Sequence, residues 1–290
     1  MIKIPDHYPT EVILLESNSA DGKPKPCVST PHGGPHVAHA TSFAPMYTAM
    51  ALEGCECPRS NKHHYCLTTF QVTISLINYT GSLGFGETYV RKLIGQAGTL
   101  DVDDCIASVR HLIKIGKSES GPGKQFVQGG SHGGFLAAHR KLLNRCRSRS
   151  VLSVFHTVIG QHPDVFSAAV VRNPVISCGE ISTTDIPDWY FEEFGLSYEP
   201  TTIMSPDLYT RLFTASPISY VDNVRARVLL HMGEVDLRVA PTNTLTFYHA
   251  LKGRSKTVEL FTFPKDSHPL DGVKTSRICW ESARDWFETK

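Results

Sequence analysis

The chain has 290 residues, of which 41% are hydrophobic, and its 29 basic and 28 acidic side chains leave a formal net charge of +1. A charge this small gives no electrostatic reason to expect a nucleic acid or an anionic membrane surface as partner. No run of the sequence approaches the ~18 apolar residues of a membrane-spanning helix, and eight cysteines are too few for a disulfide scaffold in a chain of this length. We therefore expect a globular protein of the cytoplasm with reduced thiols.

Short β-branched runs alternate with amphipathic stretches from one end of the chain to the other. In chain order we expect a strand at Glu11–Glu16, a strand at Val72–Tyr79, a helix at Thr99–Gly116, a strand-like run at Phe126–Val127, a helix at Phe135–His139, strands at Ala168–Val171 and Val228–Met232, a helix at about Thr242–Lys252, a strand at Val258–Phe263, and a closing helix with Ile278, Ala283, Trp286 and Phe287 near one face. This alternation is typical of parallel strands joined by helices. The sequence therefore predicts one α/β domain over residues 1–290, with a mostly parallel sheet flanked by helices.

Two stretches interrupt the alternation, near residues 55–71 and 140–157. Each is an addition to an otherwise regular pattern, and we hypothesise that both are translated introns. The first stretch contains several residues of metal-ligand type, namely Cys55, Cys57, His63, His64 and Cys66. Their spacing is not that of a structural zinc site, in which one Cys pair is matched by a second pair at a distance. We therefore expect no bound metal.

The segment Gly129–Gly134 contains the pattern G-x-S-x-G between a strand-like run and a helix-like run. In this context the pattern is typical of a nucleophile elbow, a tight turn that lifts a serine above the sheet. Glycines permit the turn because side chains two positions before or after the serine would meet neighbouring backbone. No Gly-Lys-Ser/Thr follows, which argues against a phosphate-binding loop. The sequence thus predicts the α/β-hydrolase fold, with Ser131 as nucleophile.

A serine hydroxyl is a weak nucleophile unless a general base and an orienting acid accompany it. Asp236 and His268 each follow a predicted strand, at positions that face the carboxyl edge of a parallel sheet. The order Ser, Asp, His along the chain is the one found in α/β-hydrolases. We expect His268 to be the general base and Asp236 the acid that orients it, with Glu234 and Asp266 as the alternatives for the acid.

Acyl transfer also needs hydrogen-bond donors where negative charge develops on the carbonyl oxygen. The segment His32–Pro35 reads HGGP, follows the run Cys27–Thr30 and is similar to the HGG-type oxyanion loops of lipases and esterases. The expected donors are the backbone N–H groups of Gly34, or Gly33, and of His132. The alternative is a glycine turn that ends a strand.

Taken together, these segments resemble the prolyl oligopeptidase family, and within it the acylaminoacyl-peptidases. The motifs that carry the resemblance are Pro31–His36, Asn78–Gly86, Gly129–Gly134, Arg172–Val175, Ser182–Trp189, and Asp236 with Arg238. They extend over most of the chain. Thr80 is a departure, because the family usually has arginine at that position.

The resemblance implies a cofactor-free serine peptidase that hydrolyses short peptides through an acyl-enzyme and releases N-acylated amino acids from blocked N-termini. It implies a substrate-binding role for Arg172, a homo-oligomer as a possible assembly, and a catalytic domain without the family's N-terminal β-propeller. A carboxylesterase, or another exopeptidase with the same three residues, is the alternative enzyme. A catalytically impaired hydrolase-fold protein is the alternative from another class, because an insertion just behind the elbow can displace Ser131.

Overall fold

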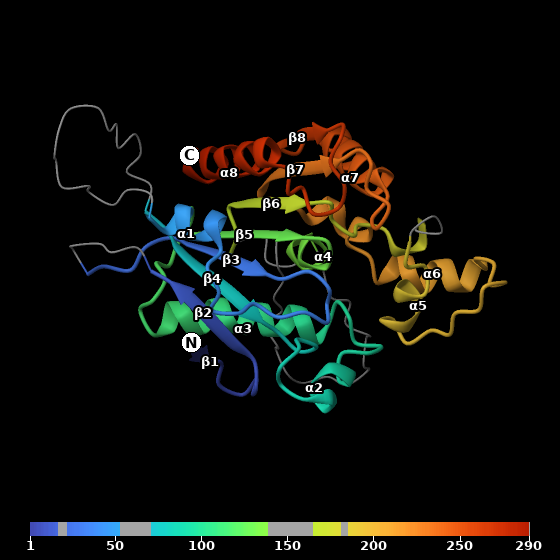
Figure 1. The fold of residues 1–290 in the computed structure, drawn as a ribbon, viewed down its shortest axis with the longest axis horizontal. Coiled ribbons are helices and arrows are strands. Elements are labelled where there is room, and N and C mark those ends of the chain that lie inside the picture. Colours follow the sequence, from blue (N-terminus) through green and yellow to red (C-terminus); the bar gives the residue numbers. More distant parts are fainter. Residues whose placement is uncertain (17–21, 53–70, 139–164, 181–184, 290) are drawn as a thin grey trace, which may run out of the picture.

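Eight strands form one sheet in the order β1-β2-β4-β3-β5-β6-β7-β8 in the computed structural model, which describes residues 1–16, 22–52, 71–138, 165–180 and 185–289 (Figure 1). The strands are β1 (Ile2–Lys3), β2 (Glu11–Leu15), β3 (Cys27–Pro31), β4 (Thr73–Asn78), β5 (Gln125–Gly130), β6 (Ala168–Arg172), β7 (Arg227–Gly233) and β8 (Val258–Phe263). The β1–β2 and β2–β4 pairs are antiparallel, and the other five pairs are parallel. Both stretches interpreted as insertions lie outside the described residues, apart from Gln71.

Helices cover both faces of this sheet (Figure 1). They are α1 (Pro45–Leu52), α2 (Glu87–Arg91), α3 (Leu100–Lys114), α4 (His132–Ala138), α5 (Trp189–Glu192), α6 (Pro206–Thr214), α7 (Pro241–Gly253) and α8 (Val273–Glu288), with 3-10 turns at Cys178–Glu180 and Pro217–Asn223. Apolar side chains of α3, α4 and α7 pack on one face, whereas those of α1 and α8 pack on the other. Because both faces are covered, strands β3 and β4 are buried along their whole length.

The predicted fold class is confirmed, and most predicted elements begin and end within two residues of the observed ones. The largest shifts are of three residues: β5 ends at Gly130 instead of Val127, and α4 begins at His132 instead of Phe135, directly after the elbow serine. Ala283, Trp286 and Phe287 of α8 are buried against the sheet, as expected, whereas Ile278 is only half-buried beside Phe263. Helices α1, α2, α5 and α6 were not predicted. Within the described part of the chain, no helix is both long and apolar enough to cross a bilayer.

Candidate active site

Ser131 lies in a tight turn between the end of β5 and the start of α4. Its φ of 56° is in the left-handed region, which costs a residue with a side chain about 1–3 kcal/mol unless its surroundings hold it there. The backbone N–H of Ser131 donates to the carbonyl oxygen of Arg172 at 3.0 Å, and its own carbonyl accepts from the N–H of Phe135 at 3.0 Å. These bonds fix the turn to the neighbouring strand β6 and to the first turn of α4.

The glycines around Ser131 are required by close backbone contacts. A Cβ on Gly129 would collide with the carbonyl oxygen of Gly133, and a Cβ on Gly133 would collide with the carbonyl oxygen of Pro31. A Cβ on Gly134 would lie 2.7 Å from Cβ of Pro174. The two positions that the sequence pattern singles out, two before and two after the serine, are therefore filled by backbone on both sides.

His268 and Asp236 come together on the loops that follow β8 and β7. Nδ1 of His268 lies 2.7 Å from Oδ2 of Asp236, whose side chain is fully buried, while 23% of the His268 side chain is exposed. The other carboxylate oxygen of Asp236 accepts from the backbone N–H groups of Arg238 at 2.8 Å and Val239 at 2.9 Å. Two backbone donors and the imidazole thus satisfy the hydrogen-bonding capacity of a buried carboxylate.

The alternative acids do not reach the imidazole. Glu234 is exposed, and Oδ2 of Asp266 accepts from Oγ1 of Thr275 at 2.7 Å, in the first turn of α8. Asp236 is therefore the carboxylate that contacts His268.

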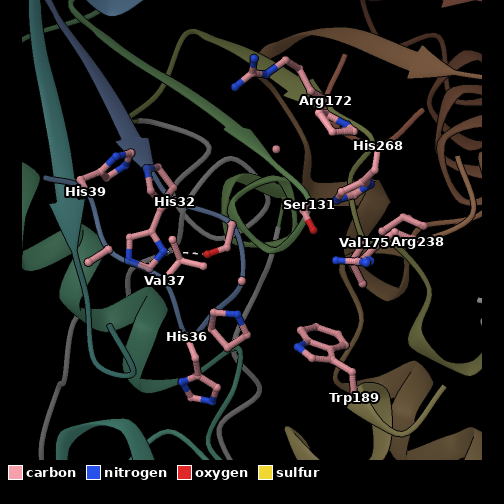
Figure 2. A pocket seen from close by; sticks show the side chains of 18 of the residues that line it. His32, His36, Val37, His39, Ser131, Arg172, Val175, Trp189, Arg238 and His268 are labelled. Atoms are coloured by element: carbon pink, nitrogen blue, oxygen red, sulfur yellow. Dashed lines mark hydrogen bonds between the residues drawn. The ribbon is translucent and has the colours of Figure 1, made fainter. Parts of the chain in front are cut away.

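A cavity of about 920 Å³ opens at the carboxyl edge of the sheet (Figure 2). Ser131 and His268 both line it, together with Gly33 and Gly34. No hydrogen bond joins Ser131 to His268, both of which the structure describes. Such bonds are often long in an empty site and shorten when the substrate is bound, so their absence here does not separate the two residues. The expected nucleophile, base and oxyanion loop therefore face one cavity.

In the loop after β3, the carbonyl groups of His32 and Gly33 face the hydroxyl of Tyr79. The hydroxyl of the buried Tyr79 donates to the carbonyl of His32 at 2.8 Å, and the His32 ring contacts the carbonyl of Gly33 through Nδ1 at 2.7 Å. In a planar trans peptide the N–H points opposite to its carbonyl, so the N–H groups of Gly33 and Gly34 point away from Tyr79. A Cβ on Gly33 would lie 3.4 Å from Cβ of Ser131, which shows how closely the loop approaches the elbow.

The side chain of His132 is not among those that line the cavity. Its Nε2 lies 2.9 Å from Oδ2 of Asp101 in α3, and both side chains are fully buried. The ring stacks on Phe135 with 4.9 Å between centroids. His132 can therefore serve the site only through its backbone N–H, which stands in the first turn of α4, where N–H groups have no acceptor within the helix.

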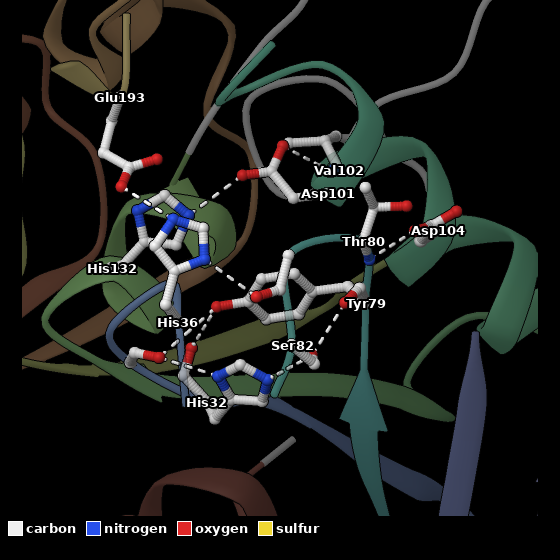
Figure 3. Close-up of polar contacts among 12 residues, drawn as sticks. His32, His36, Tyr79, Thr80, Ser82, Asp101, Val102, Asp104, His132 and Glu193 are labelled. Atoms are coloured by element: carbon white, nitrogen blue, oxygen red, sulfur yellow. Dashed lines mark hydrogen bonds and ion pairs between the residues drawn. The ribbon is translucent and has the colours of Figure 1, made fainter. Parts of the chain in front are cut away.

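A second ion pair connects the oxyanion loop to the segment after α5 (Figure 3). His36 contacts the carbonyl of Gly81 through Nδ1 at 2.8 Å and Oε1 of the buried Glu193 through Nε2 at 2.9 Å. Both ring nitrogens thus face acceptors. The bond to Glu193 raises the pKa of His36, whereas burial lowers the pKa of His32 to about 3. Of these two histidines, His36 is the one whose surroundings favour the protonated form, whereas His32 is neutral near pH 7.

Asn173 also supports the site. It belongs to the sequence motif Arg172–Val175, but nothing in the sequence indicated a role for it. Its φ is 41° and its side chain is buried. Oδ1 accepts from the N–H of Gly233 at 2.9 Å, at the end of β7, and Nδ2 donates to the carbonyl of His268 at 3.0 Å. The Asn173 amide therefore ties the loop that carries His268 to the strand that leads to Asp236.

We expect Asn173→Ala to lower kcat about 10- to 100-fold, because a displacement of His268 by about 1 Å has an effect of that size. KM is expected to change little, because Asn173 is absent from the cavity wall. Steady-state kinetics on one substrate, with the exposed Asn223→Ala as matched control, checks this. A kcat within about twofold of the parent for a folded Asn173→Ala protein would contradict the positioning role.

Two of the described residues that line the cavity are arginines, Arg172 and Arg238. Arg238 forms a bidentate pair with Asp185, with Nε 3.0 Å from Oδ1 and Nη2 3.0 Å from Oδ2. Arg172, at the end of β6, stands opposite Gly130 in the parallel register and makes no ion pair with a residue that the structure describes. The position of Arg172 on the cavity wall agrees with the substrate-side role expected for it.

The metal alternative involves Cys55–Cys66, which lies outside the described residues. Among residues 1–16, 22–52, 71–138, 165–180 and 185–289, no group of three or more His, Cys, Asp or Glu side chains is arranged to hold a metal ion.

The strand order, with Ser131, Asp236 and His268 all at the carboxyl edge of the sheet, places the protein in the α/β-hydrolase class. Its sequence matches the prolyl oligopeptidase family over residues 59–141 and 154–290, and the chain belongs to that family. Residues 142–153, within the second stretch interpreted as an insertion, fall between the two matched ranges.

Within this family, the chain is similar to acylamino-acid-releasing enzymes. The chain is 35% identical to the acylamino-acid-releasing enzyme of Arabidopsis thaliana and 34% identical to that of Mus musculus, in each case over 96% of this chain. It spans about a third of the length of these relatives, 32% and 33% respectively. Among solved structures, Pyrococcus horikoshii acylaminoacyl peptidase is similar, with a TM-score of 0.74 at 20% identity. The match covers 97% of this chain and 40% of the Pyrococcus horikoshii chain. A puromycin hydrolase matches 99% of this chain and 38% of its own with a TM-score of 0.72 at 22% identity. At this level of identity the two structures support the fold.

Proposed function

We propose that this protein is a serine peptidase that releases N-acylated amino acids from the blocked N-termini of short peptides. The observation that carries the proposal is the 2.7 Å contact between His268 and the buried Asp236 on the wall of the cavity that also holds Ser131. The relatives are named acylamino-acid-releasing enzymes, and this name supplies the proposed substrate class.

In the proposed reaction His268 Nε2 accepts the hydroxyl proton of Ser131 as Oγ attacks the scissile carbonyl carbon. Asp236 keeps the Nδ1 proton of His268 in place and stabilises the imidazolium that forms. The backbone N–H groups of Gly33 or Gly34 and of His132 donate to the oxyanion, each donor contributing about 3–4 kcal/mol. His268 then gives its proton to the departing amine as the C–N bond breaks. Water hydrolyses the remaining ester by the same steps in reverse order.

The charges of the cavity support a blocked substrate. Among the described residues that line it there is no Asp or Glu, whereas Arg172 and Arg238 both line it. Arg238 is paired with Asp185, whereas Arg172 has no ion pair with a described residue. A free α-ammonium group would thus meet the guanidinium group of Arg172 and no carboxylate among the described lining residues. Like charges disfavour each other. An acylated N-terminus is neutral and meets no such repulsion.

The apolar part of the cavity supplies a place for the acylated residue. Its described side chains include Val175, Ile186, Trp189 and Val239. Trp189 also packs edge-on against His132, with 5.7 Å between ring centroids. This wall stands beside Ser131, where the residue that is transferred to the serine would sit.

The test compares three substrates of the purified 290-residue protein. We expect N-acetyl-alanine p-nitroanilide to be cleaved with a kcat/KM at least about tenfold above that of alanine p-nitroanilide, because only the second carries the positive charge. p-Nitrophenyl acetate reports whether the nucleophile is active at all. Hydrolysis of the ester without either anilide would favour a carboxylesterase, and preference for the unblocked anilide would favour a different exopeptidase.

We propose a cytoplasmic location, which the state of the thiols supports. Cys27, Cys105, Cys178 and Cys279 are buried and free, and burial raises the pKa of Cys27 and Cys178 to about 12. Thiols of this kind are typical of reducing compartments.

A further inference from the structure

The cavity extends beyond the space that the acylated residue needs, and the two ends differ in character. Figure 2 shows Trp189 and Arg172 at opposite ends of the cavity, with Ser131 between them. Val175 lies on the Trp189 side of Ser131, whereas His268 lies on the Arg172 side (Figure 2). Pro269, the residue that follows His268, also lines the cavity.

The Arg172 end is the side toward which the leaving group departs. In amide hydrolysis the general acid stands next to the leaving nitrogen, because it must hand over its proton there. His268 lies on the Arg172 side of Ser131 (Figure 2), so the departing amino acid or peptide leaves toward Arg172.

The stem of Arg172 is close to the reacting atoms. In the sheet Arg172 pairs with Gly130, the residue before Ser131, and a Cβ on Gly130 would lie 3.9 Å from Nε of Arg172. The backbone carbonyl of Arg172 also accepts from the N–H of Ser131. Nε of Arg172 thus lies within contact distance of the residue before Ser131, which places its charge near the first one or two residues beyond the scissile bond.

The charge of Arg172 is not used inside the described part of the protein. Arg238 is paired with Asp185, whereas Arg172 makes no ion pair with a described residue, and no described lining residue is acidic. Asp236 is fully buried and satisfied by His268 and two backbone N–H groups. A guanidinium in a concave site with no anion of its own is suited to a carboxylate, which it binds through two parallel hydrogen bonds.

We propose that Arg172 forms a carboxylate subsite that binds the free C-terminal carboxylate of the leaving amino acid or dipeptide. The inference rests on the proposed function. It gives that function a length preference, because a carboxylate reaches Arg172 only when the substrate ends one or two residues after the scissile bond. The subsite thus selects acyl-dipeptides and acyl-tripeptides over longer chains and over C-terminal amides.

The test measures the ratio of kcat/KM for N-acetyl-Ala-Ala to that for its C-terminal amide, within each protein. We expect this ratio to be about 10 to 100 for the parent, as a charge-assisted bond implies, and close to one for Arg172→Gln. Arg172→Lys is expected to keep part of the ratio, because it retains the charge and loses the two-pronged geometry. Arg277→Gln, at an exposed arginine of α8, is the matched control and should behave as the parent.

A ratio is used because it cancels any general loss of activity caused by the substitution. A parent ratio near one, or a ratio that survives Arg172→Gln, would overturn the subsite. If the parent cleaves neither peptide but still hydrolyses p-nitrophenyl acetate, the proposed peptidase function fails. The subsite is then tested by using the two peptides as competitive inhibitors of ester hydrolysis. N-acetyl-Ala-Ala, with its free carboxylate, should inhibit hydrolysis of p-nitrophenyl acetate more strongly than its C-terminal amide does. Equal inhibition constants for the two compounds would contradict the carboxylate subsite. A parent inert toward all three compounds would overturn both.

Discussion

Replacing Ser131 by alanine is expected to abolish labelling by a fluorophosphonate probe and to lower kcat on N-acetyl-alanine p-nitroanilide by about 10⁶-fold. The probe reacts only with a serine whose hydroxyl is activated by a base, and the hydroxyl is the atom that this substitution removes. The remaining activity would come from binding and from the oxyanion donors, which alone are worth about 10³- to 10⁴-fold over water.

The substitution is expected to leave the fold intact. Among the described residues the Ser131 side chain makes no hydrogen bond, so none is lost, and the backbone bonds to Arg172 and Phe135 remain. Alanine meets the same strain at a φ of 56° as serine does. Circular dichroism and the thermal midpoint should therefore match those of the parent and of Ser197→Ala, an exposed control. Labelling that persists in a folded Ser131→Ala protein would mean that another residue is the nucleophile.

The same measurement distinguishes an active enzyme from a catalytically impaired one. A parent protein that folds but does not label would favour the impaired hydrolase, since the insertion near residues 140–157 follows α4 directly. Deletion of that segment would then show whether it is the cause, because the elbow glycines, His268 and Asp236 all lie outside it in the sequence.

Much of the site could be predicted because its signals are local in sequence. The elbow glycines and the serine lie within six consecutive residues, and the need for glycine there follows from backbone geometry. His268 and Asp236 were found by their positions after predicted strands, because parallel strands bring their carboxyl ends to one edge. The three residues are therefore placed by rules that need no knowledge of the rest of the fold.

The supporting residues could not be predicted because their partners are distant in sequence. Asn173 acts through the carbonyl of His268, 95 positions later, and Asp101 holds the ring of His132, 31 positions later. Tyr79 reaches back 47 positions to the carbonyl of His32. Nothing in the local pattern marks an Asn, Asp or Tyr for such a contact. Helices α2 and α5 were missed for a different reason, since five and four residues are too short to show a helical period.

Asp236→Asn is expected to lower kcat by about 10⁴-fold, for a reason that the hydrogen bonds of this site make specific. Oδ1 of Asp236 lies between the N–H groups of Arg238 and Val239, and that position can accept only an oxygen. The side-chain oxygen of asparagine must occupy it, so the NH₂ group faces Nδ1 of His268 and donates to it. Nδ1 then has no proton.

The proton of the neutral imidazole must accordingly move to Nε2, the nitrogen that has to accept the proton of Ser131. The base is thus blocked while its position is kept, and KM should stay within about threefold of the parent value. Asp266→Asn is the matched control, because Asp266 contacts Thr275 of α8 and not the imidazole, and its kcat should be near that of the parent. A loss of less than about tenfold in Asp236→Asn would show that the carboxylate does not set the tautomer of His268.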